Sequence, residues 1–97
     1  MKLLSKKRII KEDANAQLPR LNRVSGQLEG IKRMIESNRS CEDILTQLRS
    51  ARAAIKSIEG KLLNAHLQNC VRQSFANEKE QEKALNEIQT LFARFEN

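Results

Sequence analysis

The sequence predicts an all-α protein, and two observations carry this prediction. Leu, Ala, Glu, Lys, Arg and Gln are abundant, whereas β-branched residues are few and the chain has one proline, a composition that favours helices. Apolar residues also recur at spacings of three and four along most of the chain, which is the period of one helix face. A chain of 97 residues buries only a limited core by itself, so association with further copies would add to its burial.

Residues 1–16 are predicted to form a basic, flexible N-terminal arm, and residues 17–97 a single helical domain. The arm has no regular apolar pattern, and a terminal segment without one is often poorly ordered. The first helix of the domain is predicted over residues 17–37, because Pro19 fits a first helical turn and an apolar stripe follows it. This stripe consists of Leu21, Val24, Leu28, Ile31 and Ile35.

The second helix is predicted over residues 41–73. Ser40 has the character of an N-cap, since Glu42 and Asp43 follow it in what would be the first turn. Gly60 could end a shorter helix, but the apolar phase continues across it, which favours one continuous helix. Such a helix would be roughly 45 Å long and would overhang a single small core, so it invites a partner subunit.

A third amphipathic helix is predicted over residues 78–95, where Leu85, Ile88 and Leu91 mark its apolar face. This helix is acidic, whereas the chain as a whole has a net charge of +6 and carries its basic excess in residues 1–72. A basic body points to a polyanionic partner, and nucleic acid is the commonest one. The alternative is a basic protein whose charges only solvate its surface.

The sequence also bears on the cellular location. It contains no run of about 18 apolar residues, so no membrane span is expected. The N-terminus lacks the apolar stretch and small-residue cleavage site of a secretory signal. Two cysteines in a chain without such a signal indicate a cytoplasmic protein with reduced thiols.

The two cysteines and the one histidine have an informative spacing. His66 and Cys70 are four residues apart, so on a helix their side chains point to one face. Cys41 lies about 29 residues before Cys70, which is about 43 Å along a continuous helix, too far for a shared ligand or a disulfide within one subunit. An antiparallel partner would bring Cys41 of one chain beside His66 and Cys70 of the other. Two thiolates and an imidazole there would form a site for a soft metal.

Three segments together resemble the copper-sensitive operon repressor (CsoR/RcnR) family. They are R-L-N-R-V-S-G-Q-L-E-G-I-K-R-M-I-E followed by Cys41, then D-I-L-T-Q-L-R-S-A-R, and then His66-x-x-x-Cys70. The resemblance covers about residues 18–95 and implies an all-helical repressor of three helices per subunit. Its subunits would pair as antiparallel four-helix-bundle dimers and assemble into flat tetramers. It also implies that the metal-free protein binds operator double-stranded DNA, and that a bound metal or a thiol modification releases it.

Carried over residue by residue, the resemblance implies copper-type ligands at Cys41, His66 and Cys70. The predicted DNA-contacting residues are Arg20, Arg23 and Arg52, with Lys32, Arg33 and Arg49 as further members of a basic surface. Basic residues of the arm would add non-specific attraction; they are Lys6, Lys7, Arg8 and Lys11.

The chain departs from the copper-type members at one position. They often place a tyrosine directly before the first ligand cysteine, where this chain has Ser40. They also use a glutamate of the last helix to support the ligands, and Glu87 or Glu82 could serve here.

The predicted function is a repressor that releases operator DNA when Cu(I) binds, because Cu(I) is soft and suits two thiolates and an imidazole. Zinc normally takes four ligands, and nickel favours more nitrogen and oxygen. One alternative is a persulfide-sensing repressor of the same family, in which Cys41 and Cys70 are modified and no metal is bound; such relatives usually lack the histidine, so His66 favours metal. A cytosolic copper buffer would not need the basic charge. An enzyme is disfavoured, because the Cys–His pair has no glycine-rich oxyanion loop and no clear orienting acid.

Overall fold

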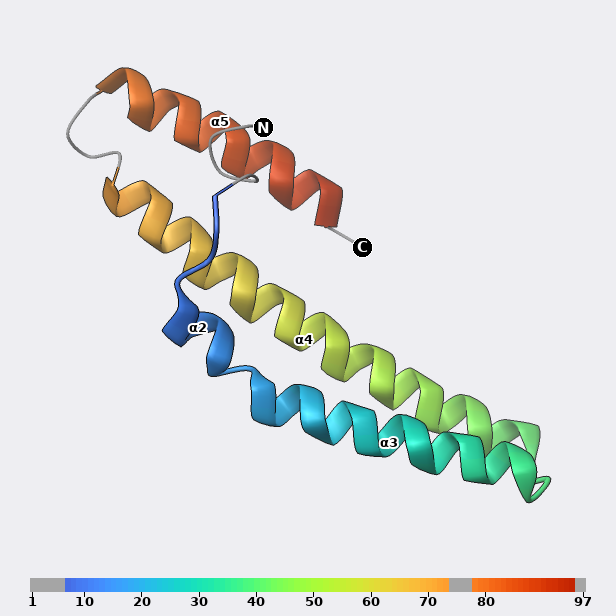
Figure 1. Cartoon of the computed structure of the whole chain (residues 1–97). Coiled ribbons are helices and arrows are strands. Elements are labelled where there is room, and N and C mark those ends of the chain that lie inside the picture. The colour runs from blue at the N-terminus through green and yellow to red at the C-terminus, as the bar shows by residue number, and fades with distance from the viewer. Residues whose placement is uncertain (1–6, 74–77, 96–97) are drawn as a thin grey trace. The chain divides into compact units, whose positions relative to one another are not determined.

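Every regular element in the described residues, 7–73 and 78–95 of a computed structural model, is a helix (Figure 1). The helices are α2 (Lys11–Asn15), α3 (Leu18–Glu36), α4 (Cys41–Gln73) and α5 (Glu78–Phe95). The all-α prediction is therefore confirmed, and the three long helices begin and end within one residue of their predicted bounds. None of the helices in this part of the chain combines the length and apolar character needed to cross a membrane.

The short helix α2 is an element that the sequence did not predict. It lies within residues 1–16, where the sequence predicts a flexible arm, and Glu12 and Asp13 occupy its first turn, where carboxylates favour a helix N-terminus. The Ala16 amide donates a hydrogen bond to the Glu12 carbonyl at 3.1 Å. Helix α2 therefore corrects the prediction for residues 11–15, whereas residues 1–6, with Lys6 among them, lie outside the described residues.

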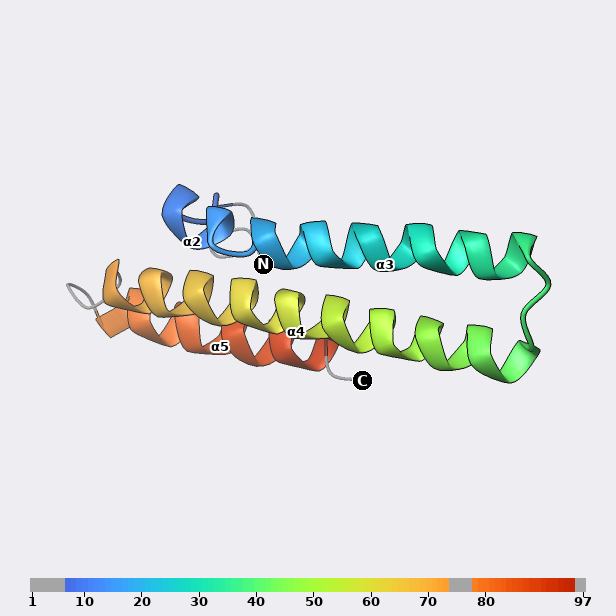
Figure 2. The ribbon, with the colours of Figure 1, turned by 90° about the horizontal axis from the view of Figure 1, so that it is seen from below.

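The chain divides into two compact units, and α4 contributes to both. Residues 11–62 form what we call the hairpin unit, and residues 1–10 with residues 63–97 form the α5 unit. In the hairpin unit, α3 lies beside the first part of α4, and a tight turn joins the two helices (Figure 1, Figure 2). The Gln27 side-chain amide donates to the Gln47 carbonyl at 3.4 Å between these helices.

The turn of the hairpin depends on Asn38, which has a positive φ of 58°. The Asn38 amide donates to the Ile35 carbonyl at 3.1 Å, and the Arg39 amide donates to the Met34 carbonyl at 2.9 Å. This pair of bonds around a left-handed residue is a Schellman motif, and asparagine tolerates that conformation better than most side chains. The polar break predicted between the first two helices is thus a defined helix end.

The hairpin unit buries only a narrow strip of its apolar residues. The buried members are Val24, Ile31, Ala51 and Ile58, which recur at a spacing of seven along each helix, as in coiled-coil seams. The neighbouring large apolar side chains are exposed; they are Leu18, Leu21, Leu28, Ile35, Leu45, Leu48 and Ile55. A large exposed apolar surface of this kind marks an interaction site, so the hairpin unit has a face that a second chain could cover.

In the α5 unit, α5 packs against residues of α4 from Leu63 onwards. Leu67, Cys70 and Leu91 form its buried cluster, with Leu63 and Ile88 packed against it. The buried positions of α5 match the predicted stripe at Leu91, whereas the neighbouring Leu85 and Phe92 are more than half exposed. Cys70 is therefore both a core residue of this unit and a predicted metal ligand.

Candidate functional site

His66 and Cys70 lie on one face of α4, as their spacing predicts. The Cys70 Sγ and the His66 Nε2 are 3.8 Å apart. Metal–ligand bonds to nitrogen and sulfur are about 2.0 to 2.3 Å long, so two such donors on one metal at a trigonal angle lie roughly 3.8 Å apart. The pair therefore has the separation of two ligands of a three-coordinate metal.

The environment of Cys70 keeps its thiol protonated. The side chain is 2% exposed and packs against Leu67 and Leu91. Burial raises the pKa of the Cys70 thiol above its ordinary value of 9.0; the Lys7 ammonium opposes this, and the Glu87 carboxylate adds to it. A metal must therefore displace the thiol proton in order to bind, because the thiolate is the ligand.

Cys41 occupies a different setting from the other two predicted ligands. It is the first residue of α4 and is exposed, whereas Cys70 lies in the last turn of that continuous helix. Within the part of the chain that the structure describes, no three histidine, cysteine or carboxylate side chains come together as a possible metal site. The described residues of one chain thus bring together two of the three predicted ligands, His66 and Cys70.

The supporting residues predicted around the ligands have distinct positions. Glu87 on α5 is near enough to act on the thiol of Cys70, whereas Glu82 on the same helix is exposed. Ser40 caps α4, since the Asp43 amide donates to its Oγ at 3.1 Å. Of the two glutamates offered by the sequence, the geometry favours Glu87.

Lys7 is the residue near this site that the sequence analysis did not place there. Its Nζ donates to the Gln73 Oε1 at 3.4 Å, at the last residue of α4, and its charge acts on Cys70. The sequence marks Lys7 only as one basic residue of the arm. No spacing or motif connects it with α4, because a contact between residues so far apart in the chain depends on the tertiary fold.

All six predicted DNA-contacting residues are exposed on the hairpin unit. On α3 they are Arg20, Arg23, Lys32 and Arg33, and on α4 they are Arg49 and Arg52. Lys32 pairs with Glu29 at 3.2 Å, and the Arg20 Nη1 donates to the Gln17 Oε1 at 3.3 Å. Arg49 and Arg52 are three residues apart and so share one helix face. The surface thus combines a cation that is balanced by a local carboxylate, Lys32, with arginines whose charges are open to a partner.

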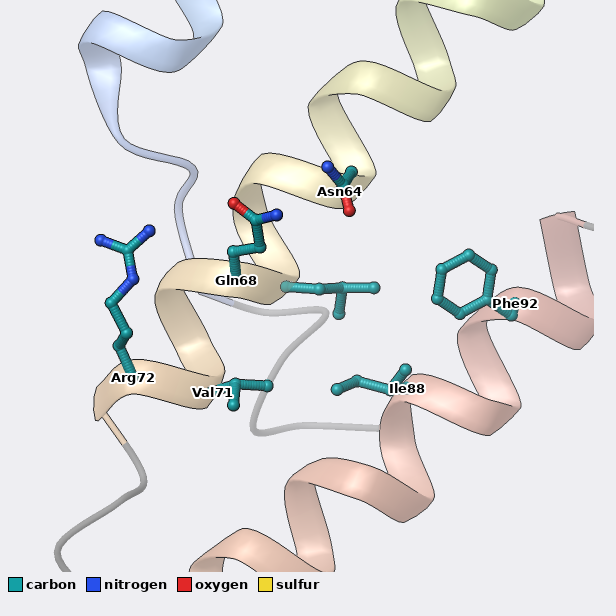
Figure 3. A pocket seen from close by; sticks show the side chains of 7 residues that line it. Asn64, Gln68, Val71, Arg72, Ile88 and Phe92 are labelled. Atoms are coloured by element: carbon teal, nitrogen blue, oxygen red, sulfur yellow. The ribbon is translucent and has the colours of Figure 1, made fainter.

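An open groove lies between α4 and α5 within the α5 unit (Figure 3). Its volume is about 310 Å³. The residues lining it are Asn64, Leu67, Gln68, Val71, Arg72, Ile88 and Phe92. Isoleucine and phenylalanine side chains from α5 face α4 across the groove, while Arg72 extends away from it (Figure 3). Because its lining has no thiol, imidazole or carboxylate, the groove is distinct from the His66–Cys70 pair.

Comparison with known proteins points to one family. The family model for metal-sensitive transcriptional repressors matches residues 13–94. The copper-sensing transcriptional repressor RicR of Mycobacterium tuberculosis is 46% identical over 57 residues, which cover 59% of each chain. The copper-sensing transcriptional repressor CsoR of Bacillus subtilis is 37% identical over 76 residues, 78% of this chain and 74% of the relative. The match thus spans less than two thirds of RicR.

Two solved structures have a similar fold. The copper-sensing repressor CsoR with Cu(I) from Geobacillus thermodenitrificans has a TM-score of 0.74 and 32% identity, and the match covers 94% of each chain. The nickel-responsive transcriptional regulator InrS has a TM-score of 0.72 and 30% identity, and covers 84% of this chain and 90% of its own. The two neighbours respond to different metals, so the fold alone does not choose between copper and nickel.

Proposed function

The chain belongs to the metal-sensitive transcriptional repressor family, which includes the copper-sensitive operon repressors, and we propose that it is a Cu(I)-responsive repressor. In this proposal the metal-free protein binds operator DNA in the cytoplasm. Cu(I) binds to Cys41 of one chain with His66 and Cys70 of another, and the loaded protein releases the DNA. The protein acts by binding alone, in line with relatives that are named as repressors.

The observation that carries the choice of metal is the His66–Cys70 pair. Its donors are 3.8 Å apart, and one sulfur with one nitrogen already form two sides of a trigonal site. A second thiolate completes a donor set that is soft and low in coordination number, which suits Cu(I). Nickel, the metal named for InrS, favours nitrogen and oxygen donors, and this chain has one histidine in all.

The third ligand is expected from a second subunit. Cys41 is exposed at the start of α4, and the exposed apolar residues of the hairpin unit provide a face for an antiparallel partner. Pairing through a two-fold axis would give each dimer two equivalent sites. Two such dimers would form the tetramer that we expect on the operator.

The persulfide-sensing alternative is less well supported. Redox-sensing cysteines are usually exposed and have a lowered pKa, because the thiolate is the reactive form. Cys70 is buried and its pKa is raised. The copper-buffer alternative leaves the exposed arginines of the hairpin unit without a role, whereas DNA phosphates would use them.

The shared site can be tested by complementation. Cys41→Ala chains and Cys70→Ala chains each lack one ligand in every site of their own oligomers. Unfolded together and refolded as an equal mixture, they should form heterodimers in which one of the two sites is intact. We expect tight Cu(I) binding, measured by competition with a Cu(I) chelator, to recover to roughly a quarter of the wild-type amount, as random pairing in two-fold dimers requires. Recovery no greater than that of either variant alone would refute the intersubunit site.

A further inference from the structure

The segment formed by residues 7–10, which we call the docking segment, belongs to the α5 unit and not to the hairpin unit that follows it in the chain. Lys7 anchors it, because the Lys7 Nζ donates to the Gln73 Oε1 at 3.4 Å. Gln73 is the last residue of α4, and Cys70 lies one turn before it. The docking segment therefore meets α4 at the end that carries the predicted metal ligands.

Two electrostatic features favour a cation at this position. The C-terminal end of a helix carries a partial negative charge, because its last carbonyl groups have no partner within the helix. The Cys70 thiol is also within electrostatic range of the Lys7 ammonium. Lys7 thus responds both to the helix end and to any change of charge at the ligands.

Metal binding would change that charge. Two thiols and a neutral imidazole carry no net charge, whereas two thiolates holding one monovalent cation carry one negative charge, the two protons having passed to solvent. The attraction between this site and Lys7 therefore increases when the site is filled. The same lysine, with the exposed Arg8 beside it, is also attracted to DNA phosphates.

Resting on the proposed function, we propose that the docking segment is a regulatory arm that the filled metal site holds on α4, which withdraws Lys7 and Arg8 from DNA. DNA and the filled site then compete for the same cations. Because coupling between two ligands is reciprocal, DNA that holds the segment also weakens metal binding by the same factor.

The reactivity of Lys7 toward an acylating reagent tests this proposal without DNA. An amine held against a negative group keeps its proton and reacts more slowly. In anaerobic protein, we expect Cu(I) to slow acylation of Lys7 by about two- to fivefold, the range for an exposed charge pair. Acylation is measured by mass spectrometry against Lys11 of the same chain, which is exposed at the start of α2 and serves as an internal reference.

Substitutions at Gln73 test the docking contact itself. Gln73→Ala should speed Lys7 acylation in the metal-free protein, because the acceptor is removed. Gln73→Glu should slow it and should weaken operator binding by about two- to fivefold. Since an added carboxylate repels DNA by itself, the comparison is a double-mutant cycle with Lys7→Gln: the effect of Gln73→Glu on DNA affinity should shrink when Lys7 is absent.

The outcomes separate this proposal from the proposed function. If Cu(I) binds and releases DNA while Lys7 acylation stays unchanged, the regulatory arm is wrong and the copper-responsive repressor stands. If Gln73→Glu weakens DNA binding equally with and without Lys7, the docking contact plays no part in DNA binding. If Cu(I) does not bind at all, both proposals fall, because the arm has lost its trigger.

Discussion

At the residue scale, Cys70 has two roles with opposite chemical requirements. As a core residue it is buried against Leu67 and Leu91, which favours the neutral thiol. As a metal ligand it must be a thiolate. The neighbouring charges divide in the same way, since Glu87 favours the thiol and Lys7 favours the thiolate. A metal-free site that holds its proton is neutral, which limits the cost of burying it.

The raised pKa of Cys70 predicts a loss of stability in mildly alkaline solution. Below the ordinary pKa of 9.0, the folded and unfolded chains both keep the proton, and the stabilising contribution is complete. Above it, the unfolded chain loses the proton first, so the free energy of unfolding falls as the pH rises through the folded-state pKa. The measurement is urea denaturation of metal-free, reduced protein between pH 7 and about 10 at constant protein concentration.

The cysteine variants identify the source of that pH dependence. The chain has no tyrosine, so cysteines and lysines are its main titrating side chains in this range. Cys70→Ala should flatten the decline, whereas Cys41→Ala should keep the wild-type slope. A decline that is equally steep in Cys70→Ala would assign it to the lysines.

His66 is the ligand on which we expect release, more than binding, to depend. Two thiolates can hold Cu(I) by themselves, whereas the imidazole ties the metal to a defined position on α4, one turn before Cys70. His66→Ala should therefore keep much of its Cu(I) binding and lose most of the coupling. Allosteric coupling is typically on the order of 5- to 150-fold in affinity, and in the variant it should approach onefold.

Titration of Cu(I) into operator-bound His66→Ala protein, followed by fluorescence anisotropy of the DNA, measures that coupling. Release as complete as in the wild type would mean that the cysteines alone carry the signal, and it would favour the thiol-sensing alternative.

At the scale of elements, the helix ends decide where the ligands lie. Cys41 is the first residue of α4, so its position depends on the cap before it. Ser40 provides that cap through its bond to the Asp43 amide. The sequence predicted this cap correctly, because a serine followed by two acidic residues is a local signal. It did not predict α2, since five residues are too few for an apolar period to emerge.

Ser40→Ala tests the importance of the cap. We expect the free energy of unfolding to fall by about 1 kcal/mol, the usual effect of removing a serine N-cap. Cu(I) affinity should also fall, because a frayed first turn no longer fixes Cys41. Ser40→Thr is the matched control, since it keeps a hydroxyl acceptor and should keep most of both properties. Equal stability of the alanine and threonine variants would show that the cap is dispensable.

At the scale of the whole molecule, periodicity predicted which helices form but not which apolar residues are covered. Val24 and Leu28 belong to one predicted stripe, yet Val24 is 5% exposed and Leu28 is 41% exposed. A helix stripe is wider than the contact that a single neighbour makes, so the number of partners decides its burial. The same limit applies to the site: the four-residue spacing predicted the His66–Cys70 pair, whereas the contacts of Lys7 depend on the tertiary fold.

The predicted DNA surface can be tested through the salt dependence of operator binding. Arg23 and Arg52 are exposed on α3 and α4. If each neutralises a phosphate, its replacement by alanine should lower the slope of log affinity against log salt by about 0.9, because fewer counterions are released. Affinity should fall for all sequences alike, and stability should change little, since both side chains are exposed.

Arg39 offers a matched control for that measurement. It is an exposed arginine of the same unit, but its guanidinium pairs with Asp43 at 3.2 Å, so its charge is already balanced locally. Arg39→Ala should leave the salt slope nearly unchanged, although it removes the same formal charge. Lys32→Ala should have an intermediate effect, because Lys32 belongs to the predicted contact surface but pairs with Glu29. Equal slopes in all four variants would mean that only net charge matters, and would remove Arg23 and Arg52 from the interface.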